Sequence, residues 1–210
     1  SGKPHAVETV TNTDSLISNK DQNITYNSVN NVSQITEMIG SDLYKLNFFY
    51  SPKDVLWKSV LSKNGTIVRT TLYGPEYEKV TENGVTKNVY YIYSMDGLAA
   101  VYVKQDGQAD AVYYANVDHQ GSVVSLMDAS GTFVFKASYD AWGKQKIDLN
   151  NCNFYHGYAA YEHIPEFGLV NMGGRLYDPT LGRYLSPAKS FPTEATSQVY
   201  NSYSMNQNNP

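Results

Sequence analysis

The chain is poor in cysteine, in charge and in long apolar runs, and each shortage excludes a class of protein. Its single cysteine, Cys152, has no partner for an internal disulfide, so we expect a buried apolar residue there. Charged residues make up 17% and the formal net charge is -4, which suits neither a nucleic-acid-binding surface nor a strongly disordered chain. No run of 18 apolar residues is present, and residues 1–4 lack a signal-peptide core. We expect a chain that is soluble as given, in one domain or two small ones, with any export signal lying upstream.

Aromatic content then indicates the fold class. The chain has 19 tyrosines against 7 phenylalanines and 2 tryptophans. Tyrosine suits pleated surfaces that are half buried and half wet, so this composition favours β structure.

Short aromatic runs and turn residues alternate along the chain with a spacing of about 20 residues. Dipeptides such as Asn64-Gly65, Asn83-Gly84 and Asp106-Gly107 favour hairpins between the strands. Segments 97–104 and 121–128 both open on glycine, and they read as the same strand of successive hairpins. We therefore predict an all-β fold of antiparallel hairpin repeats, with helix below about a tenth of residues. An ordinary meander with evenly spaced turns is the alternative, and it is all-β as well.

The pattern is less regular between residues 150 and 171, where segment 159–163 is expected to form a short helical turn before Pro165. Segment 173–187 follows and holds two of the three arginines. Asp178-Pro179 predicts a turn, Gly182 a positive-φ position, and the flanking Arg-Leu-Tyr and Arg-Tyr-Leu triplets predict short strands. We expect Arg175 and Arg183 to donate forked hydrogen bonds to carbonyls and carboxylates.

These motifs, in this order, resemble the Rhs-repeat-associated core domain of bacterial Rhs and YD-repeat proteins. The matching segments are 118–131, 137–143, 155–158, 166–169, 173–187 and 200–210, and the resemblance covers about residues 22 to 210. Several repeats carry Tyr-Asn, Tyr-Ser or Tyr-Gly where the family often has Tyr-Asp. The positions that carry the signature, for which we expect structural roles, are Asp118, Gly121, Tyr139, Asp140, Gly143, Gly174, Arg175, Tyr177, Asp178, Pro179, Gly182, Arg183, Tyr184, Ser186 and Pro187.

The resemblance implies a strip of antiparallel sheet that curves or spirals into a hollow shell. Residues 1–147 would form the hairpin repeats, and residues 148–210 an irregular core region, continuous with them, that plugs one end. It implies a non-enzymatic shell segment that encapsulates or presents a variable, often toxin-like, C-terminal segment. Such a protein would be bacterial, and secreted or associated with the cell envelope. The implied partners are upstream repeats and the downstream cargo of a longer chain, with no cofactor, metal, nucleic acid or membrane span. A chain of 210 residues forms only part of a shell, so its open strand edge would allow self-association.

Self-cleavage is the strongest enzymatic alternative, because many family members cut their own chain after the core with paired aspartates in Asp-Pro-x-Gly elements. Here the position after Leu185-Ser186-Pro187 is Ala188, followed by Lys189-Ser190. The second aspartate would lie beyond Asn208-Asn209-Pro210. Both catalytic positions are missing, so the chain would be at most a remnant of such a core.

Three other sets of residues suggest chemistry, and each has a simpler explanation. Asp118, His119 and Ser122 are the residue types of a catalytic triad, but they also suit a hairpin turn, and no nucleophile elbow is present. A metal could be held by His156, Glu162, His163 and Glu166, although their spacing fits no known ligand pattern. Asp178 before a proline is expected to cap its own turn rather than to act as a general acid.

A carbohydrate- or protein-binding module at the cell surface is the remaining alternative. Tyrosines on the faces of a sheet would offer stacking platforms to sugars, whereas cross-strand tyrosine ladders would explain the same residues without a ligand.

Overall fold

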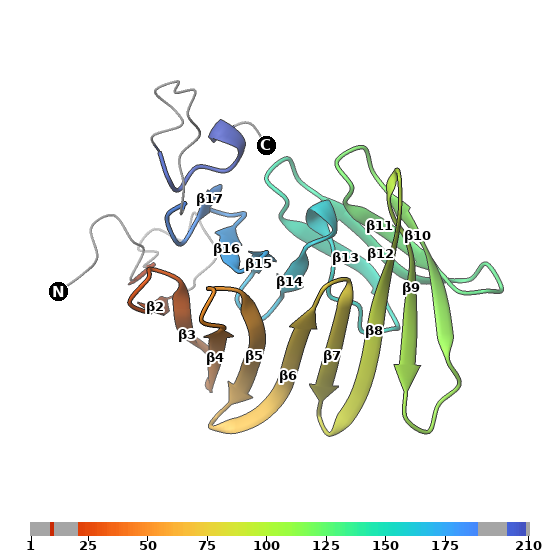
Figure 1. Cartoon of the computed structure of the whole chain (residues 1–210), viewed down its shortest axis with the longest axis horizontal. Coiled ribbons are helices and arrows are strands. Elements are labelled where there is room, and N and C mark those ends of the chain that lie inside the picture. The colour runs from red at the N-terminus through yellow and green to blue at the C-terminus, as the bar shows by residue number, and fades with distance from the viewer. Residues whose placement is uncertain (1–8, 11–20, 189–200, 209–210) are drawn as a thin grey trace.

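The computed structural model describes residues 9–10, 21–188 and 201–208, and nearly all of its regular structure is antiparallel sheet (Figure 1). The first thirteen strands form one sheet in which every strand pairs with its neighbours in the chain. The sheet is open, because its edge strands β1 and β13 do not pair with each other. The strands are β1 Thr9–Val10, β2 Gln22–Tyr26, β3 Val32–Ile39, β4 Asp42–Tyr50, β5 Leu56–Lys63, β6 Thr66–Gly74, β7 Tyr77–Glu82, β8 Val85–Ser94, β9 Gly97–Gln105, β10 Ala111–Val117, β11 Val123–Met127, β12 Phe133–Tyr139 and β13 Gln145–Asn150. The predicted all-β fold of hairpin repeats is confirmed.

Five turns of this sheet share one five-residue geometry. In each, the N–H of the first residue bonds the carbonyl of the fifth, and the fourth residue has a positive φ. The side chain of the first residue accepts hydrogen bonds from the third and fifth N–H groups, which is why Asn, Asp or Ser stands there. The first residues are Asn27, Ser51, Asp118, Asp128 and Asp140. Several other turns are two-residue hairpins such as Asn64-Gly65, where both residues have a positive φ.

The two faces of the sheet differ in what they carry. Along β7, Glu78, Val80 and Glu82 point to the inner face, and the residues between them point outward. On the outer face Tyr77, Tyr90 and Tyr102 lie in register on β7, β8 and β9, with ring centroids 5.0 and 5.8 Å apart. The outer tyrosines therefore form a cross-strand ladder.

A second, four-stranded sheet lies against the inner face. Its strands are β14 Glu162–Ile164, β15 Leu169–Met172, β16 Arg175–Asp178 and β17 Arg183–Tyr184, accompanied by the 3-10 turns η1 Tyr158–Ala160 and η3 Asn206–Asn208. We call residues 151–188 and 201–208 the plug. The first predicted arginine triplet lies within β16, and the second forms β17 over Arg183–Tyr184, with Leu185 outside the strand. The helical turn predicted over 159–163 is present only as the 3-10 turn η1, which ends at Ala160; Ala159 and Ala160 have positive φ angles of 48° and 57°, and the chain enters β14 at Glu162.

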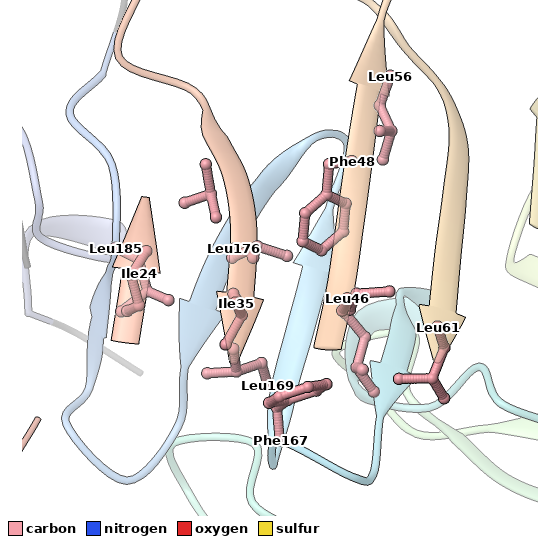
Figure 2. Close-up of a cluster of buried hydrophobic side chains, with 12 residues drawn as sticks. Ile24, Ile35, Leu46, Phe48, Leu56, Leu61, Phe167, Leu169, Leu176 and Leu185 are labelled. Atoms are coloured by element: carbon pink, nitrogen blue, oxygen red, sulfur yellow. The ribbon is translucent and has the colours of Figure 1, made fainter. Parts of the chain in front are cut away.

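Apolar side chains join the plug to the sheet at two places. Figure 2 shows one cluster, in which Leu169, Leu176 and Leu185 of the plug meet Ile35 and Phe48 of the sheet. Each such side chain contributes roughly 1.5–3 kcal/mol when fully buried. The second cluster packs Phe154 of the plug on the inner residues of β8 to β12. The plug thus shares two hydrophobic clusters with the sheet.

Contacts also tie the plug to strands near both ends of the sheet. The Tyr26 hydroxyl on β2 donates to the Leu185 carbonyl, and Tyr177 donates to the Trp142 carbonyl between β12 and β13. The division at residue 147 stays a prediction, and β13 runs across it. No helix in the described part of the chain is long and apolar enough to cross a membrane.

Candidate functional site: the junction of plug and sheet

Three groups of buried polar residues hold the plug on the inner face. The first is centred on His156, whose Nε2 lies 2.9 Å from Glu78 Oε1 and whose Nδ1 lies 2.7 Å from the Ala160 carbonyl. Burial alone would lower the pKa of His156, but the Glu78 carboxylate outweighs it and raises the pKa to about 9. Burial opposes the charge of Glu78 as well, yet His156 and the hydroxyl of Tyr91, 2.9 Å away, lower its pKa. The imidazolium and the carboxylate, each with about 12% of its side chain exposed, therefore form a largely buried ion pair across the junction.

The second group surrounds Glu162 at the start of β14. Its Oε2 accepts hydrogen bonds from the Tyr73 hydroxyl at 2.8 Å and from Asn171 Nδ2 at 2.9 Å, while Tyr73 also contacts Ser59. Burial and the charge of Glu78 raise the pKa of Glu162. This carboxyl group is thus held by hydrogen bonds from both the sheet and the plug.

The third group is a forked ion pair between Arg69 on β6 and Glu166 in the turn after β14. Two bonds of 2.9 Å join their nitrogen and oxygen atoms, and Arg69 also lies 3.4 Å from Glu82. The ring of Tyr155 stacks under the guanidinium at 4.5 Å and its hydroxyl bonds Glu82. Only 6% of the Arg69 side chain is exposed, so the pair is desolvated and depends on both partners.

Two cavities flank these groups. One of about 450 Å³ lies beside Cys152 and Tyr155, and another of about 400 Å³ lies beside Tyr161. Glu78, Tyr91 and Glu162 line both cavities. Cys152 is half-buried rather than buried, and burial raises the pKa of its thiol to about 11, which keeps it protonated.

The signature segment fastens the end of the plug. Arg175 Nη2 donates to the carbonyls of Ser186 and Ser202, both at 2.9 Å, and its guanidinium lies 3.7 Å from the Tyr184 ring centroid. These partners are carbonyls, as expected, but the expected carboxylate is replaced by an aromatic ring. Arg183 lies over the ring of Tyr203 at 5.1 Å, and its Nε has no hydrogen-bond partner.

The signature turn also locks onto the turn that follows β12. The Tyr177 hydroxyl donates to the Trp142 carbonyl at 2.8 Å, and the Trp142 ring covers Gly182, where a Cβ would come within 3.1 Å. Gly143 is covered by the Tyr158 ring, and a Cβ there would come within 2.5 Å of it. Gly182 thus supports the Trp142 ring and Gly143 the Tyr158 ring, and a Cβ at either position would press against that ring.

The remaining signature residues have local structural places. Asp118, Gly121 and Asp140 build five-residue turns, and the Tyr139 hydroxyl donates to the Val123 carbonyl at 2.6 Å. Asp178 accepts hydrogen bonds from the N–H groups of Thr180 and Leu181, so it caps the Pro179 turn. The Gly174 N–H donates to Asn171 Oδ1, and the Tyr184 hydroxyl donates to the Met172 sulfur. Ser186 is buried, and Pro187 is half-buried. Their wider roles in the family stay proposals.

The residues suggested for catalysis or metal binding are used elsewhere. Asp118 Oδ1 is held by its own turn, and Ser122 Oγ accepts from the Ala159 N–H. His156 and Glu166 are paired with sheet residues, and no described group of three His, Cys, Asp or Glu side chains is arranged to hold a metal. Ala188 donates its N–H to the Ser202 carbonyl at 2.8 Å; Lys189-Ser190 and Asn209-Pro210 lie outside the described residues.

Sequence reasoning missed the buried charges of the inner face. Glu78 and Glu82 alternate with outward residues on β7, with Val80 between them, so their period places them on the apolar side of the strand. That pattern is a signal of a buried ionic group. Their partners in the plug, His156 and Tyr155, lie 78 and 73 positions further along, and no local pattern connects them.

The chain is thus a strip of antiparallel hairpins whose inner face is covered by the plug. This arrangement defines a β-shell protein built from repeats. The model of the Teneurin YD-shell family matches residues 12–210, and the chain belongs to that family. This confirms the resemblance to Rhs and YD-repeat proteins.

Several proteins of similar sequence or structure are much longer than this chain, which spans only a small part of each. The tRNA3(Ser)-specific nuclease WapA of Bacillus spizizenii is 31% identical over 138 residues, which is 64% of this chain and 6% of WapA. Human Teneurin-4 is 27% identical over 131 residues, 57% of this chain and 5% of its own. A crystal structure of TcdB2-TccC3-Cdc42 matches with a TM-score of 0.73 and 17% identity, over 90% of this chain and 10% of that one. A Photorhabdus luminescens Tc holotoxin pore with the TccC3-D651A mutation matches with a TM-score of 0.69.

Proposed function

We propose that the chain is the plug-bearing end of a YD-repeat shell, which encloses or presents a variable C-terminal segment of a longer polypeptide. The domain would act as structure and not as an enzyme. Its partners would be upstream repeats, paired to the β1 and β2 end of the strip, and the downstream cargo. Secretion or attachment to a bacterial cell envelope follows from the same proposal.

The observation that carries the proposal is the set of buried charges shared by sheet and plug. Arg69, Glu78 and Tyr73 on the sheet take partners from the plug, so the inner face is complete only with the plug in place. A surface open to solvent would not need buried ion pairs, because water would solvate the same groups. Such ion pairs suit a sheet whose inner face is closed to solvent.

The relatives support a toxin-associated role without fixing the cargo. WapA is named as a tRNA nuclease, and the chain covers only 6% of it, so the nuclease activity belongs to a part that need not correspond to this one. The chain carries alanine at position 188, where the family's first cleavage aspartate would stand. The absence of a carboxylate at this position supports a domain that does not cut itself.

Limited proteolysis of the natural full-length polypeptide tests the enclosure. We expect the segment after residue 210 to resist protease as long as the shell is folded, and to become sensitive in an Arg69→Met variant that loosens the plug. Lys63→Met, which removes an exposed ion pair with Asp42, is the matched control and should leave protection unchanged. A downstream segment that is equally sensitive in all three proteins would refute enclosure.

Mass spectrometry tests the proposed lack of self-cleavage. The intact mass of the chain should stay constant on long incubation, and a discrete C-terminal peptide released from it would refute a purely structural role.

The outer tyrosine ladder supports a second candidate, a surface that binds carbohydrate. Tyr77, Tyr90 and Tyr102 present adjacent rings on a face that the plug does not cover. Binding to a glycan array that is lost in Tyr90→Ala and kept in Ile92→Ala would support it. Equal signals from wild type and Tyr90→Ala would leave the ladder with a packing role alone.

A further inference from the structure

The cavity of about 400 Å³ beside Tyr161 is lined by tyrosines and carboxylates from the sheet and the plug. Its tyrosines are Tyr73, Tyr77, Tyr91, Tyr93 and Tyr161, and its carboxylates are Glu76, Glu78 and Glu162. The other lining residues are glycines, alanines, an asparagine and a histidine, and no lysine or arginine is among those that the structure describes there. Aromatic faces and carboxylates both attract positive charge, so this lining favours a cation.

His156, the histidine of the lining, is itself held there as a cation. Its Nδ1 lies 2.7 Å from the Ala160 carbonyl oxygen, and its Nε2 lies 2.9 Å from Glu78 Oε1. A carbonyl and a carboxylate only accept hydrogen bonds, so both ring nitrogens carry protons and the ring is an imidazolium. The Tyr91 ring lies beside it, with the two centroids 4.4 Å apart. Glu78 balances this charge, so the imidazolium does not cancel the charge of Glu76.

Glu76 brings a negative charge to the cavity that no ion pair within the described residues balances. It is exposed in the turn between β6 and β7, and its carbonyl accepts the Tyr91 N–H at 2.9 Å. Burial, followed by the charges of Glu76 and Glu78, raises the pKa of Tyr93, so the field of Glu76 reaches that side chain. Tyr93 is 46% exposed and Tyr161 is 41% exposed, so a ligand can reach both rings.

A guanidinium group matches this combination of rings and carboxylate. It is planar and always charged, it stacks on aromatic faces, and it forms forked hydrogen bonds to a carboxylate. An anion would meet like charge in the cavity, and an apolar group would make no use of Glu76. The volume lies at the lower end of the roughly 300–1,000 Å³ of small-ligand cavities, which suits one long side chain.

The guanidinium cannot come from this chain, because its three arginines have other partners. They contact Glu166, the carbonyls of Ser186 and Ser202, and the ring of Tyr203. The ligand therefore belongs to another polypeptide.

We propose that this cavity binds an arginine side chain of a partner polypeptide, with the guanidinium stacked on Tyr93 and Tyr161 and paired with Glu76. The site needs only the folded chain. It does not rest on the enclosure of a cargo, and its failure would leave that proposal intact.

Titration of the isotope-labelled chain with N-acetyl-arginine N-methylamide, followed by NMR shifts of the Tyr93 and Tyr161 rings, tests the site. We expect saturable binding. The citrulline analogue has nearly the same shape but no charge, and it should bind roughly tenfold more weakly because it forms neither an ion pair nor a cation–π contact. Absence of binding, or equal binding of the two amides, would overturn the proposal without any mutation.

Matched variants test the location. Glu76→Gln should weaken binding of the blocked arginine roughly tenfold, whereas Asp106→Asn, which removes an exposed carboxylate from another turn, should bind as wild type does. Tyr93→Leu should also weaken binding, and Tyr114→Leu, a change of a tyrosine of 54% exposure on β10, is its control. Urea midpoints check that every variant is folded. Folded Glu76→Gln and Tyr93→Leu variants that bind as tightly as their controls would place the ligand elsewhere and refute the site.

A longer ligand tests the polypeptide class. A blocked pentapeptide with a central arginine among alanines should bind at least as tightly as the single blocked arginine. Weaker binding of the pentapeptide would show that the cavity does not admit an arginine within a chain, and would overturn the proposed partner.

Discussion

Replacing Arg69 by methionine tests whether the plug is energetically part of the sheet. The change keeps much of the aliphatic packing but leaves Glu166 and Glu82 without their cation. Removing one partner of a buried ion pair costs about 3–5 kcal/mol. Glu166 and Glu82 keep 20% and 23% exposure and can be partly rehydrated, so we expect the low end, about 3 kcal/mol. For a chain of this length that lowers Tm by roughly 6–12 °C.

Urea denaturation followed by tyrosine and tryptophan fluorescence measures the change. The double variant Arg69→Met with Glu166→Gln should be less destabilised than the sum of the single variants by at least about 1 kcal/mol, because the second change removes the stranded charge. Lys63→Met, in the exposed pair with Asp42, is the control and should leave the midpoint nearly unchanged. Additive effects in the cycle, or an Arg69→Met midpoint as close to wild type as that of Lys63→Met, would refute the reasoning.

Three further predictions concern other parts of the junction. The raised pKa of His156 should stabilise the fold fully below about pH 6.5, and this contribution should be lost as the pH rises through about 9. In urea midpoints measured against pH, His156→Gln should flatten that decline. An unchanged pH dependence of the midpoint in the variant would contradict this. Gly143 and Gly131 both have a φ near +83°, so alanine at either position should lower the free energy of unfolding by about 1 kcal/mol. Only Gly143→Ala also brings a Cβ against the Tyr158 ring, so calorimetry should show a further loss of about 1–3 kcal/mol for that variant. Equal losses would show that the ring moves aside freely. Arg175→Lys should cost about 1–3 kcal/mol through its two carbonyl bonds, and an unchanged Tm would exclude that role.

Much of the sheet could be predicted because its determinants are local. A positive φ at Asn64-Gly65 and an aspartate that bonds its own turn at Asp118 depend only on residues within a few positions. The same holds for the two short strands around Asp178-Pro179. The helical turn predicted over 159–163 is limited to the 3-10 turn η1. Ala159 and Ala160 have high intrinsic helix propensity, but the hydrogen bonds from Ala159 N–H to Ser122 and between His156 and Ala160 hold their backbone in a left-handed conformation.

The sequence by itself determined the class of fold, the hairpin repeats and the family, because turn chemistry and alternation along a strand act over short distances. The tertiary structure alone decided the partners of the buried charges. Arg69 meets Glu166, 97 positions away, and Glu78 meets His156, 78 positions away, only after the plug has folded back onto the sheet. The sequence gives the charge of each residue, but its desolvation and pairing depend on which surfaces come together in the fold. For the same reason, only the folded chain brings Glu76 and Tyr161, from distant parts of the sequence, to one cavity.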